Sequence, residues 1–391
     1  MRQYLDLVKH VLATGSRKEN RTGVDTISTF GYYYEHDMRE GFPLLTTKKL
    51  SWKNIVIELL WFLSGTNESA FLDRHSCGFW RPWYDKKGGV FAAYGPAWRR
   101  FEYPRWRESE TGLVDDGYVV AWNDQVRWVL DKLKRSPMAR DLVVSAWQPH
   151  IAQQPPTANA YWAPCHAMWI LNVQNEELFE HPYSVFPNDD PHWEHRLGYV
   201  MASTQEEADA KAREKFRDEG RVFASDTQSQ FELAVAKSKR WNPSGSPDGW
   251  LDKPMIPEGH RQRLCLHLTQ RSCDVALGIP YNIASYGLLL SLMARFAGME
   301  PGVFGHTLVD AHIYCAKPDG SKAEFDHIPG LQEQLQRKLR PLPRLIIDDS
   351  IRDLSDVEAL LKPEVTTDEI MAKFRIEGYQ PHENIPFKVA V

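Results

Sequence analysis

The stretch Ala163-Pro164-Cys165-His166 carries residues suited to covalent chemistry, and it leads into the apolar run 168–171. Proline lacks an amide donor and fixes its own φ, so it suits the entry to a strand. Cys165 would then stand at a strand end, where its thiol can face a cleft and act as a nucleophile. The alternative is that Cys165 is a small buried hydrophobe, because free cysteine is among the most buried residue types.

A second candidate is Glu58, which stands in the middle of a strongly amphipathic helix expected over 52–63. A carboxylate beside Leu59, Leu60 and Trp61 either lies on the wet face of that helix or takes part in function. The local sequence leaves both interpretations open.

The elements that must position these residues follow from hydrophobic periodicity and turn signals. Apolar spacing predicts helices over 3–14, 52–63, 123–134 and 283–297. Gly15 is expected to end the first of these helices and Gly298 the last. Alternation and short apolar runs predict strands over 25–37, 141–147, 168–171, 264–268, 307–314 and 344–347. An aromatic-rich loop is expected over 77–100.

Residues 176–262 lose the regular pattern and are expected to form a separate insert. Within it, we predict a short strand over 199–202, a helix over 203–220 and a second helix over 227–241. Its role is not indicated by any motif that we recognise.

Composition narrows the class of protein. The chain has 391 residues, 42% hydrophobic and 25% charged, with a net charge of −5, which favours neither a nucleic-acid groove nor a membrane surface. Five scattered cysteines without a Cys-x-x-Cys pair predict no disulfide framework, no zinc site and a reducing, cytoplasmic setting. We expect no signal peptide and no membrane span. No metal is expected either, because the only tempting cluster lacks fixed ligand spacing: Asp189, Asp190, His192 and His195.

Ordered blocks along the chain together resemble the thymidylate synthase family. They are Asn20-Arg21-Thr22-Gly23, Gly41-Phe42-Pro43-Leu44-Leu45-Thr46-Thr47-Lys48, Glu58-Leu59-Leu60-Trp61-Phe62-Leu63, Val144-Ser145-Ala146-Trp147, Pro164-Cys165-His166-Ala167, Gln270-Arg271-Ser272-Cys273-Asp274, Pro280-Tyr281-Asn282-Ile283-Ala284-Ser285-Tyr286, Asp310-Ala311-His312-Ile313-Tyr314, Arg340-Pro341-Leu342-Pro343 and Ile376-Glu377-Gly378-Tyr379. The resemblance implies an α+β fold with a curved mixed sheet flanked by helices. The catalytic domain would comprise 1–175 and 263–391, with 176–262 as a small α/β insert, and two copies would form a homodimer through their sheet faces.

The resemblance implies covalent catalysis on dUMP. A thiolate that adds to C6 of uracil turns C5 into a nucleophile, which can take the one-carbon unit of 5,10-methylenetetrahydrofolate. Cys165 is implied to supply that thiolate, with nearby cations lowering its pKa. Glu58 resembles the carboxylate that organises water and proton traffic. Tyr94 resembles the phenol that helps remove the C5 proton, and His166 the histidine beside the water network at O4.

Four residues are implied to hold the nucleotide phosphate: Arg21, Arg271, Ser272 and, from a partner subunit, Arg140. The alternative for the arginines is surface ion pairing.

Asn282 is implied to recognise the base, because an amide can donate to O4 and accept from N3–H of uracil. Cytosine presents the opposite pattern, so asparagine here implies dUMP rather than dCMP; the alternative is a turn asparagine after Pro280. His312 and Tyr314 resemble the pair that bonds the 3′-hydroxyl of the sugar.

The folate co-substrate would meet a separate group of residues. Asp274 resembles the carboxylate that holds the pterin ring, and Lys48 the cation near the glutamate tail. Trp80, Trp83 and Leu277 would offer apolar faces to the flat ring. The carboxylate of Val391 would close the site and exclude water.

The sequence also departs from the family pattern. Asp141 follows Arg140 where a second arginine is usual, Val309 replaces a glycine, and bulky Trp162 replaces a leucine that packs near Trp80. A large side chain beside Trp80 can displace the folate or re-aim water, so we expect water to trap the C5 methylene, as in the related viral deoxyuridylate hydroxymethylases. The expected activity is therefore a dUMP hydroxymethylase that yields 5-hydroxymethyl-dUMP. The alternatives are a thymidylate synthase, which yields dTMP and dihydrofolate by hydride transfer, and an inactive nucleotide-binding protein.

Overall fold

The computed structural model describes residues 1–20, 22–85, 87–90, 94–106, 118–149, 163–177, 181–187, 198–202, 205–217, 222–226 and 260–389. Contacts divide the chain into two compact units. The first comprises Met1–Asn172 and Leu264–Val391, and the second is Val173–Arg263.

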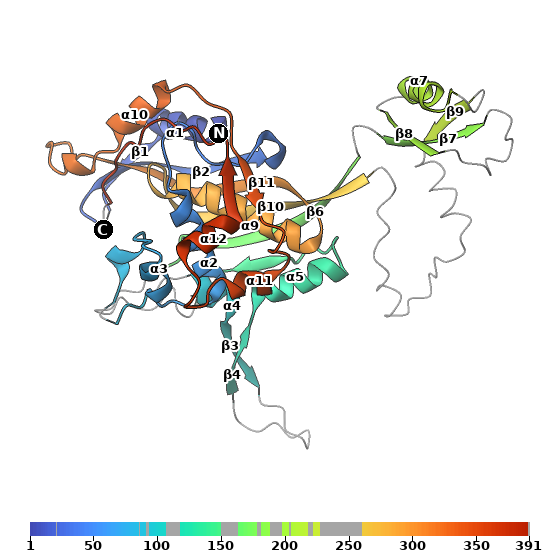
Figure 1. The fold of residues 1–391 in the computed structure, drawn as a ribbon. Helices are drawn as coiled ribbons and strands as arrows, with labels where there is room; N and C mark the ends of the chain where they lie inside the picture. Colours follow the sequence, from blue (N-terminus) through green and yellow to red (C-terminus); the bar gives the residue numbers. More distant parts are fainter. Residues whose placement is uncertain are drawn as a thin grey trace, which may run out of the picture. The chain divides into compact units, whose positions relative to one another are not determined.

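A six-stranded mixed sheet forms the centre of the first unit (Figure 1). Its strands, in spatial order, are β1 (Ser16–Lys18), β2 (Asp25–Asp37), β11 (Glu300–Cys315), β10 (His260–Asp274), β6 (His166–Glu177) and β5 (Val143–Ser145). The long antiparallel pair of β2 and β11 runs from Val303 opposite Asp37 to Cys315 opposite Asp25. This register places Tyr34 directly opposite His306.

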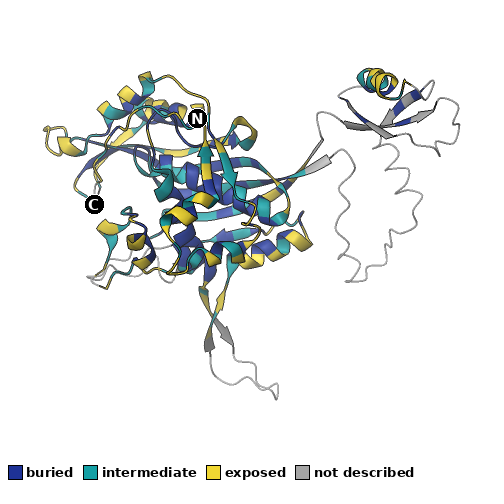
Figure 2. Cartoon of the chain, in the orientation of Figure 1, coloured by how far each residue is buried: buried dark blue, intermediate teal, exposed yellow. Residues whose placement is uncertain are grey.

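Four helices pack around this sheet: α1 (Arg2–Thr14), α2 (Trp52–Ser64), α9 (Gly278–Ala297) and α10 (Ile328–Gln336). Helix α9 packs on β11 and on α2, while α1 packs on β2. Helices α2 and α9 are buried along most of their length (Figure 2). Helix α2 begins where the Ser51 hydroxyl accepts from the Asn54 amide at 3.4 Å and ends at Gly65, whose φ of 76° suits glycine.

The remaining elements of this unit are shorter. They are α3 (Ala70–Arg74), α4 (Tyr94–Arg99), α5 (Gln125–Arg135), α11 (Leu354–Ala359), α12 (Thr367–Lys373), three single-turn 3₁₀ helices (Met38–Glu40, Arg81–Trp83, Ala323–Phe325), and two antiparallel ribbons, β3 (Phe101–Trp106) with β4 (Tyr118–Asn123) and β12 (Arg344–Ile347) with β13 (Phe374–Glu377). Arg99, at the end of α4, joins α4 to α5 and α11, since its guanidinium binds Asp124 at 2.8 Å and Glu358 at 2.6 Å.

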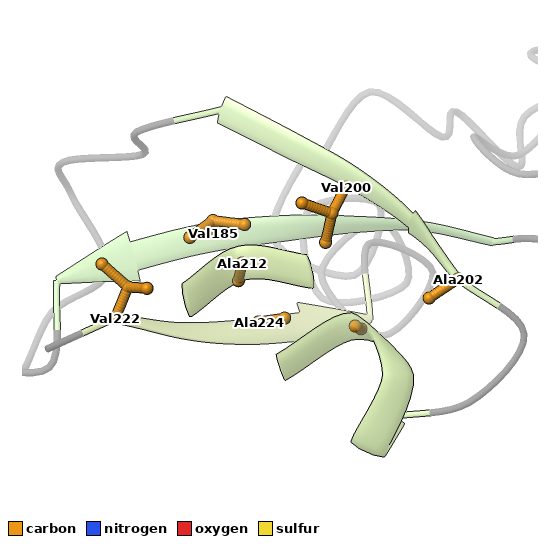
Figure 3. Packing of buried hydrophobic residues seen from close by; sticks show 7 residues of the cluster. Val185, Val200, Ala202, Ala212, Val222 and Ala224 are labelled. Carbon is orange, nitrogen blue, oxygen red and sulfur yellow. The ribbon is translucent and has the colours of Figure 1, made fainter. Parts of the chain in front are cut away.

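The second unit has its own small core. Its sheet has the order β8 (Gly198–Ala202), β7 (His181–Pro187), β9 (Val222–Asp226), and helix α7 (Gln205–Lys215) packs on it. Figure 3 shows the buried valines and alanines between helix and sheet: Val185, Val200, Ala202, Ala212, Val222 and Ala224. The Asp209 carboxylate accepts from the Ala224 amide at 2.9 Å, which fixes α7 on β9.

The α+β fold expected from the sequence is confirmed, and several local predictions need correction. The region 77–100 is not only a loop, because α4 begins at Tyr94. The helix expected from 123 begins at Gln125, since the Asp124 carboxylate caps it by accepting from the Arg127 amide at 3.0 Å. The strand expected over 141–147 is limited to Val143–Ser145. The helix expected over 203–220 is seen as Gln205–Lys215, and the one over 227–241 lies outside the described residues.

Candidate active site

The thiol-bearing residue stands at the start of a strand, as the preceding proline predicted. Cys165 immediately precedes β6, and its carbonyl accepts from the Arg271 amide of β10 at 2.7 Å. Its side chain is partly exposed, so the alternative of a sealed core cysteine does not hold. Neighbouring β10 thus fixes the backbone at Cys165 while the side chain stays accessible.

Tyr94 and His166 lie together beside this cysteine. Their rings stack with centroids 4.4 Å apart and 6° between the planes, and the His166 amide donates to the Tyr94 hydroxyl at 3.4 Å. Burial, and secondarily the charge of Cys165, raises the pKa of Tyr94 well above its usual value. Tyr94 is therefore a neutral phenol at physiological pH.

The His166 ring is held in its neutral form. Burial lowers the pKa of His166 to about 4, although a side-chain hydrogen bond with Asn282 partly opposes that effect. The Nδ1 atom of His166 lies 3.2 Å from the Tyr286 hydroxyl. A neutral imidazole with hydrogen-bonding groups near its ring can orient a substrate or a water without adding charge.

Glu58 is buried rather than placed on the wet face of α2. Its Oε1 accepts from the Trp80 indole N–H at 2.7 Å. Burial raises the pKa of Glu58 to about 7, and the Trp80 hydrogen bond lowers it by a smaller amount. The Trp80 ring also lies 6.0 Å from Tyr94 and 5.9 Å from Trp83. The carboxyl can consequently gain or lose a proton near neutral pH.

Asn282 lies in the second turn of α9, facing the end of β10. Its Oδ1 accepts from the Gln270 side chain at 3.1 Å, and its side chain also bonds His166. Asn282 is therefore an anchored helix residue, and not a turn asparagine. Gln270 itself also donates to the Ser272 carbonyl at 3.0 Å.

The residues expected at the phosphate are only partly brought together. The exposed Arg271 guanidinium donates to the Ala163 carbonyl at 3.0 Å, next to Cys165, and Ser272 follows it on β10. Arg140 is exposed, and its neighbour Asp141 forms a salt bridge with Lys132. Arg21 lies outside the described residues.

His312 and Tyr314 occupy alternate positions of β11, so they share one face of the strand. Their rings meet edge to face with centroids 5.4 Å apart. The His312 Nδ1 atom lies 3.1 Å from the Asp310 carbonyl, which leaves the other ring nitrogen as the one able to meet a ligand.

Of the residues expected to meet the folate, Asp274, Leu277 and Lys48 lie where β10 turns into α9, whereas Trp80 and Trp83 lie beside Glu58 and Tyr94. Asp274 caps that turn, because its Oδ1 accepts from the amides of Ala276 at 3.0 Å and Leu277 at 3.1 Å. The buried Lys48 ammonium donates to the Ala276 carbonyl at 2.5 Å and lies 4.7 Å from the Phe387 ring. Burial lowers the pKa of Lys48 to about 8, while the charge of Asp274 opposes this.

Other expectations cannot be placed. Val391 and Trp162 lie outside the described residues, as do Asp189, Asp190, His192 and His195. Within the part of the chain that the structure describes, no group of three or more His, Cys, Asp or Glu is placed to hold a metal ion. None of the helices described there is long and apolar enough to cross a membrane.

Sequence reasoning missed three residues that hold the site together: Gln270, Tyr286 and His306. Gln270 and Tyr286 belong to the sequence blocks that resemble the family, but their roles depend on contacts with Asn282 and His166. The sequence pattern could have indicated Gln270 and His306. Each is a polar residue at a position where the alternation of its strand predicts a buried apolar side chain, and such a residue needs a hydrogen-bond partner.

Comparison with known proteins agrees with this geometry. A family model described as "Thymidylate synthase" matches residues 2–184 and 251–391. A thymidylate synthase from Haloferax volcanii is 32% identical over 363 residues, which cover 90% of this chain and 79% of that protein. The family model covers most of the chain, so the chain belongs to the thymidylate synthase family and is a folate-dependent transferase of one carbon to dUMP.

Proposed function

We propose that this chain is a thymidylate synthase, which methylates C5 of dUMP and releases dTMP and dihydrofolate. The observation that carries this proposal is the packing of Tyr94 against both His166 and Trp80 beside the accessible thiol. The Haloferax volcanii relative, matched over most of both chains, is named for the same activity. The hydroxymethylase that the sequence favoured depended on Trp162, which lies outside the described residues.

The first step belongs to Cys165. Its thiolate adds to C6 of the uracil ring, so that the ring electrons make C5 nucleophilic towards the one-carbon unit. Arg271, whose guanidinium contacts the carbonyl of Ala163, places a cation near the thiol. A nearby cation favours the thiolate form and is also suited to the nucleotide phosphate.

Base recognition belongs to Asn282. Its Oδ1 accepts from Gln270 and still has a lone pair for N3–H of uracil, while its amide hydrogens can donate to O4. His312 and Tyr314 would bond the 3′-hydroxyl of the sugar. The phosphate would lie against Arg271 and Ser272, together with Arg21 and with Arg140 of a second copy.

Proton movement belongs to Tyr94, His166 and Glu58. Once the one-carbon unit is bound to C5, the C5 proton must leave, and a water held by the Tyr94 hydroxyl beside Cys165 would take it and pass it on. The neutral His166 ring orients that water. Glu58 can take up or release a proton near pH 7, because its pKa is about 7.

The residues near the β10–α9 turn fit a flat ring with an anionic tail. Bound 5,10-methylenetetrahydrofolate supplies the one-carbon unit and the hydride. Asp274 and Leu277 lie at the turn, and the Lys48 ammonium is the cation there. Trp80 and Trp83 offer ring faces, and the C-terminal segment ending at Val391 would exclude water. The exposed Tyr33 of β2 lies on the sheet face opposite to that of Tyr34, and it suits the interface of the expected homodimer.

The test uses the full chain with 5,10-methylenetetrahydrofolate and dUMP carrying tritium at C5. We expect tritium release matched by an equal amount of dihydrofolate, seen by absorbance, and a product with the mass of dTMP. Tritium release without dihydrofolate, with a product one oxygen heavier, would refute the proposal in favour of hydroxymethylation. No release at all would leave only nucleotide binding.

A further inference from the structure

Three polar side chains form an unbroken line across the buried face of the sheet. Tyr34 of β2, His306 of β11 and Gln270 of β10 come from neighbouring strands. The Tyr34 hydroxyl lies 2.7 Å from His306 Nδ1, and His306 Nε2 lies 3.1 Å from Gln270 Oε1. Gln270 then reaches Asn282 of α9.

These positions are unusual for polar groups. His306 is completely buried between the equally buried Phe304 and Leu308 of the same strand row, and Gln270 follows Leu266 and Leu268 in the same way. A polar group in such a row destabilises the fold unless each of its atoms is hydrogen-bonded. The line satisfies that condition because each of its members bonds the next.

The direction of every hydrogen bond in the line follows from one fixed point. The Ser272 carbonyl can only accept, so the Gln270 atom 3.0 Å away must be the amide nitrogen. Its second hydrogen goes to Asn282, which must accept through Oδ1. Gln270 Oε1 therefore faces His306 and must accept from its Nε2–H.

The direction of the next hydrogen bond, between His306 and Tyr34 of β2, follows from the state of the histidine ring. Burial lowers the pKa of His306 well below its usual value, so the ring is neutral and has a single N–H. Since that hydrogen lies on Nε2, Nδ1 is an acceptor and the Tyr34 hydroxyl donates to it. Burial raises the pKa of Tyr34 well above its usual value, which keeps its proton in place.

We propose that Tyr34 and His306 are positioning residues that fix, through Gln270, the orientation of the Asn282 amide and so set the preference for uracil over cytosine. With Oδ1 turned towards Gln270 and N3, the amide presents a donor to O4. A flipped amide presents the pattern that cytosine needs. This inference rests on the proposed function, in which Asn282 recognises the base.

Removing either residue weakens the Gln270 restraint on the amide, which then depends on its bond with His166. His306→Leu leaves Gln270 Oε1 buried without a donor. The free energy that this costs is comparable with that of the hydrogen bonds that now hold Gln270 in place, so the Gln270 side chain can turn to find another partner. Tyr34→Phe leaves His306 Nδ1 without a donor. The Nε2–H tautomer still donates to Gln270 Oε1, but the ring has lost the bond that fixes its rotation, so this donor is held less firmly and the restraint on Gln270 weakens.

The test measures binding of dUMP and of dCMP to the full-length chain by calorimetry, without folate. We expect the ratio of the two affinities to fall by about tenfold in His306→Leu and by a smaller factor in Tyr34→Phe. His306→Gln keeps a neutral N–H donor of similar reach and should recover most of the ratio. Tyr379→Phe is the matched control, because it removes a partly buried phenol that donates to the Leu45 carbonyl at 2.9 Å, away from the line.

If Tyr34 and His306 had only a structural role, the substitutions would weaken the binding of both nucleotides by the same factor or would lower only the melting temperature. Tyr34→Phe is nearly isosteric, so it keeps the test decisive if His306→Leu does not fold. An unchanged ratio of affinities in Tyr34→Phe would overturn this inference and leave the proposed function standing. A parent chain that does not prefer dUMP would overturn the proposed function together with it.

Discussion

Replacing Trp80 by phenylalanine tests how the carboxyl of Glu58 is tuned. Two opposing effects act on that carboxyl: burial raises its pKa to about 7, and the Trp80 N–H at 2.7 Å stabilises the ionised form. Trp80→Phe keeps an aromatic ring against Tyr94 but removes the donor. The pKa of Glu58 should therefore rise.

The size of the effect follows from the strength of that bond. A hydrogen bond to a charged group contributes about 1.5–3 kcal/mol, and 1.36 kcal/mol corresponds to one pH unit, so the range is about one to two pH units. Water that enters the space left by the indole restores part of the bond. We therefore expect the lower end of the range, about one pH unit.

The assay is the pH dependence of kcat/KM for tritium release from dUMP, which reports on the steps before the final reduction. The parent chain should lose activity on acidification with an apparent pKa near 7, and this acid limb should move upward in Trp80→Phe. Trp83→Phe is the matched control, because it removes an indole that lies edge to face with Trp80 at 5.9 Å between centroids and leaves the bond to Glu58 intact. An acid limb that stays in place, or that moves equally in both variants, refutes the assignment.

Three further outcomes are expected. Cys165→Ala should abolish tritium release while dUMP still binds, as measured by calorimetry, because the adduct at C6 cannot form; turnover in this variant would remove the basis of the assignment. Glu58→Gln should flatten the pH dependence of stability. Because the folded pKa of about 7 lies above the usual 4.5, the contribution of this carboxyl to stability is fully present below pH 4.5 and is lost, on the order of 3 kcal/mol, as the pH rises through 7. Parent and variant profiles that run parallel in urea unfolding would contradict this. Arg99→Met should destabilise the fold by about 3–5 kcal/mol in the same measurement, since it leaves Asp124 and the Leu63 carbonyl without a buried partner. Arg127 is a half-exposed arginine that pairs with the carboxylates of Asp124 and Glu358, so Arg127→Met should lower the free energy of unfolding by less than about 1 kcal/mol. Equal losses of stability in the two variants would count against the burial argument.

The long elements were predictable because their patterns are local. Helix α9 follows from a continuous apolar run closed by Gly298, whose φ of 69° is one that glycine adopts readily. The strand after Pro164 also follows from its neighbours in sequence. These features depend on residues within one or two turns of each other, so the chain could be interpreted without its tertiary contacts.

The short elements were missed for the opposite reason. Helix α4 has six residues and contains Gly95 and Pro96, which usually mark a turn. Its position is fixed by Arg99, which binds Asp124 and Glu358 from distant parts of the chain. Strand β3 contains Pro104, which weakens any strand pattern. Tertiary contacts decide these segments, and the sequence does not display them.

The two interpretations of Glu58 show most clearly what the sequence could not decide. A glutamate between apolar neighbours has the same pattern on a wet face and in a buried site. Burial brings the pKa of the Glu58 carboxyl to about 7 against the opposing hydrogen bond from Trp80, and burial brings the pKa of Lys48 to about 8. An acid and a base thus both titrate near neutral pH, although neither does so in water. Because burial is what moves both values, the proton chemistry of this site belongs to the packing around α2 and the β10–α9 turn rather than to any single motif.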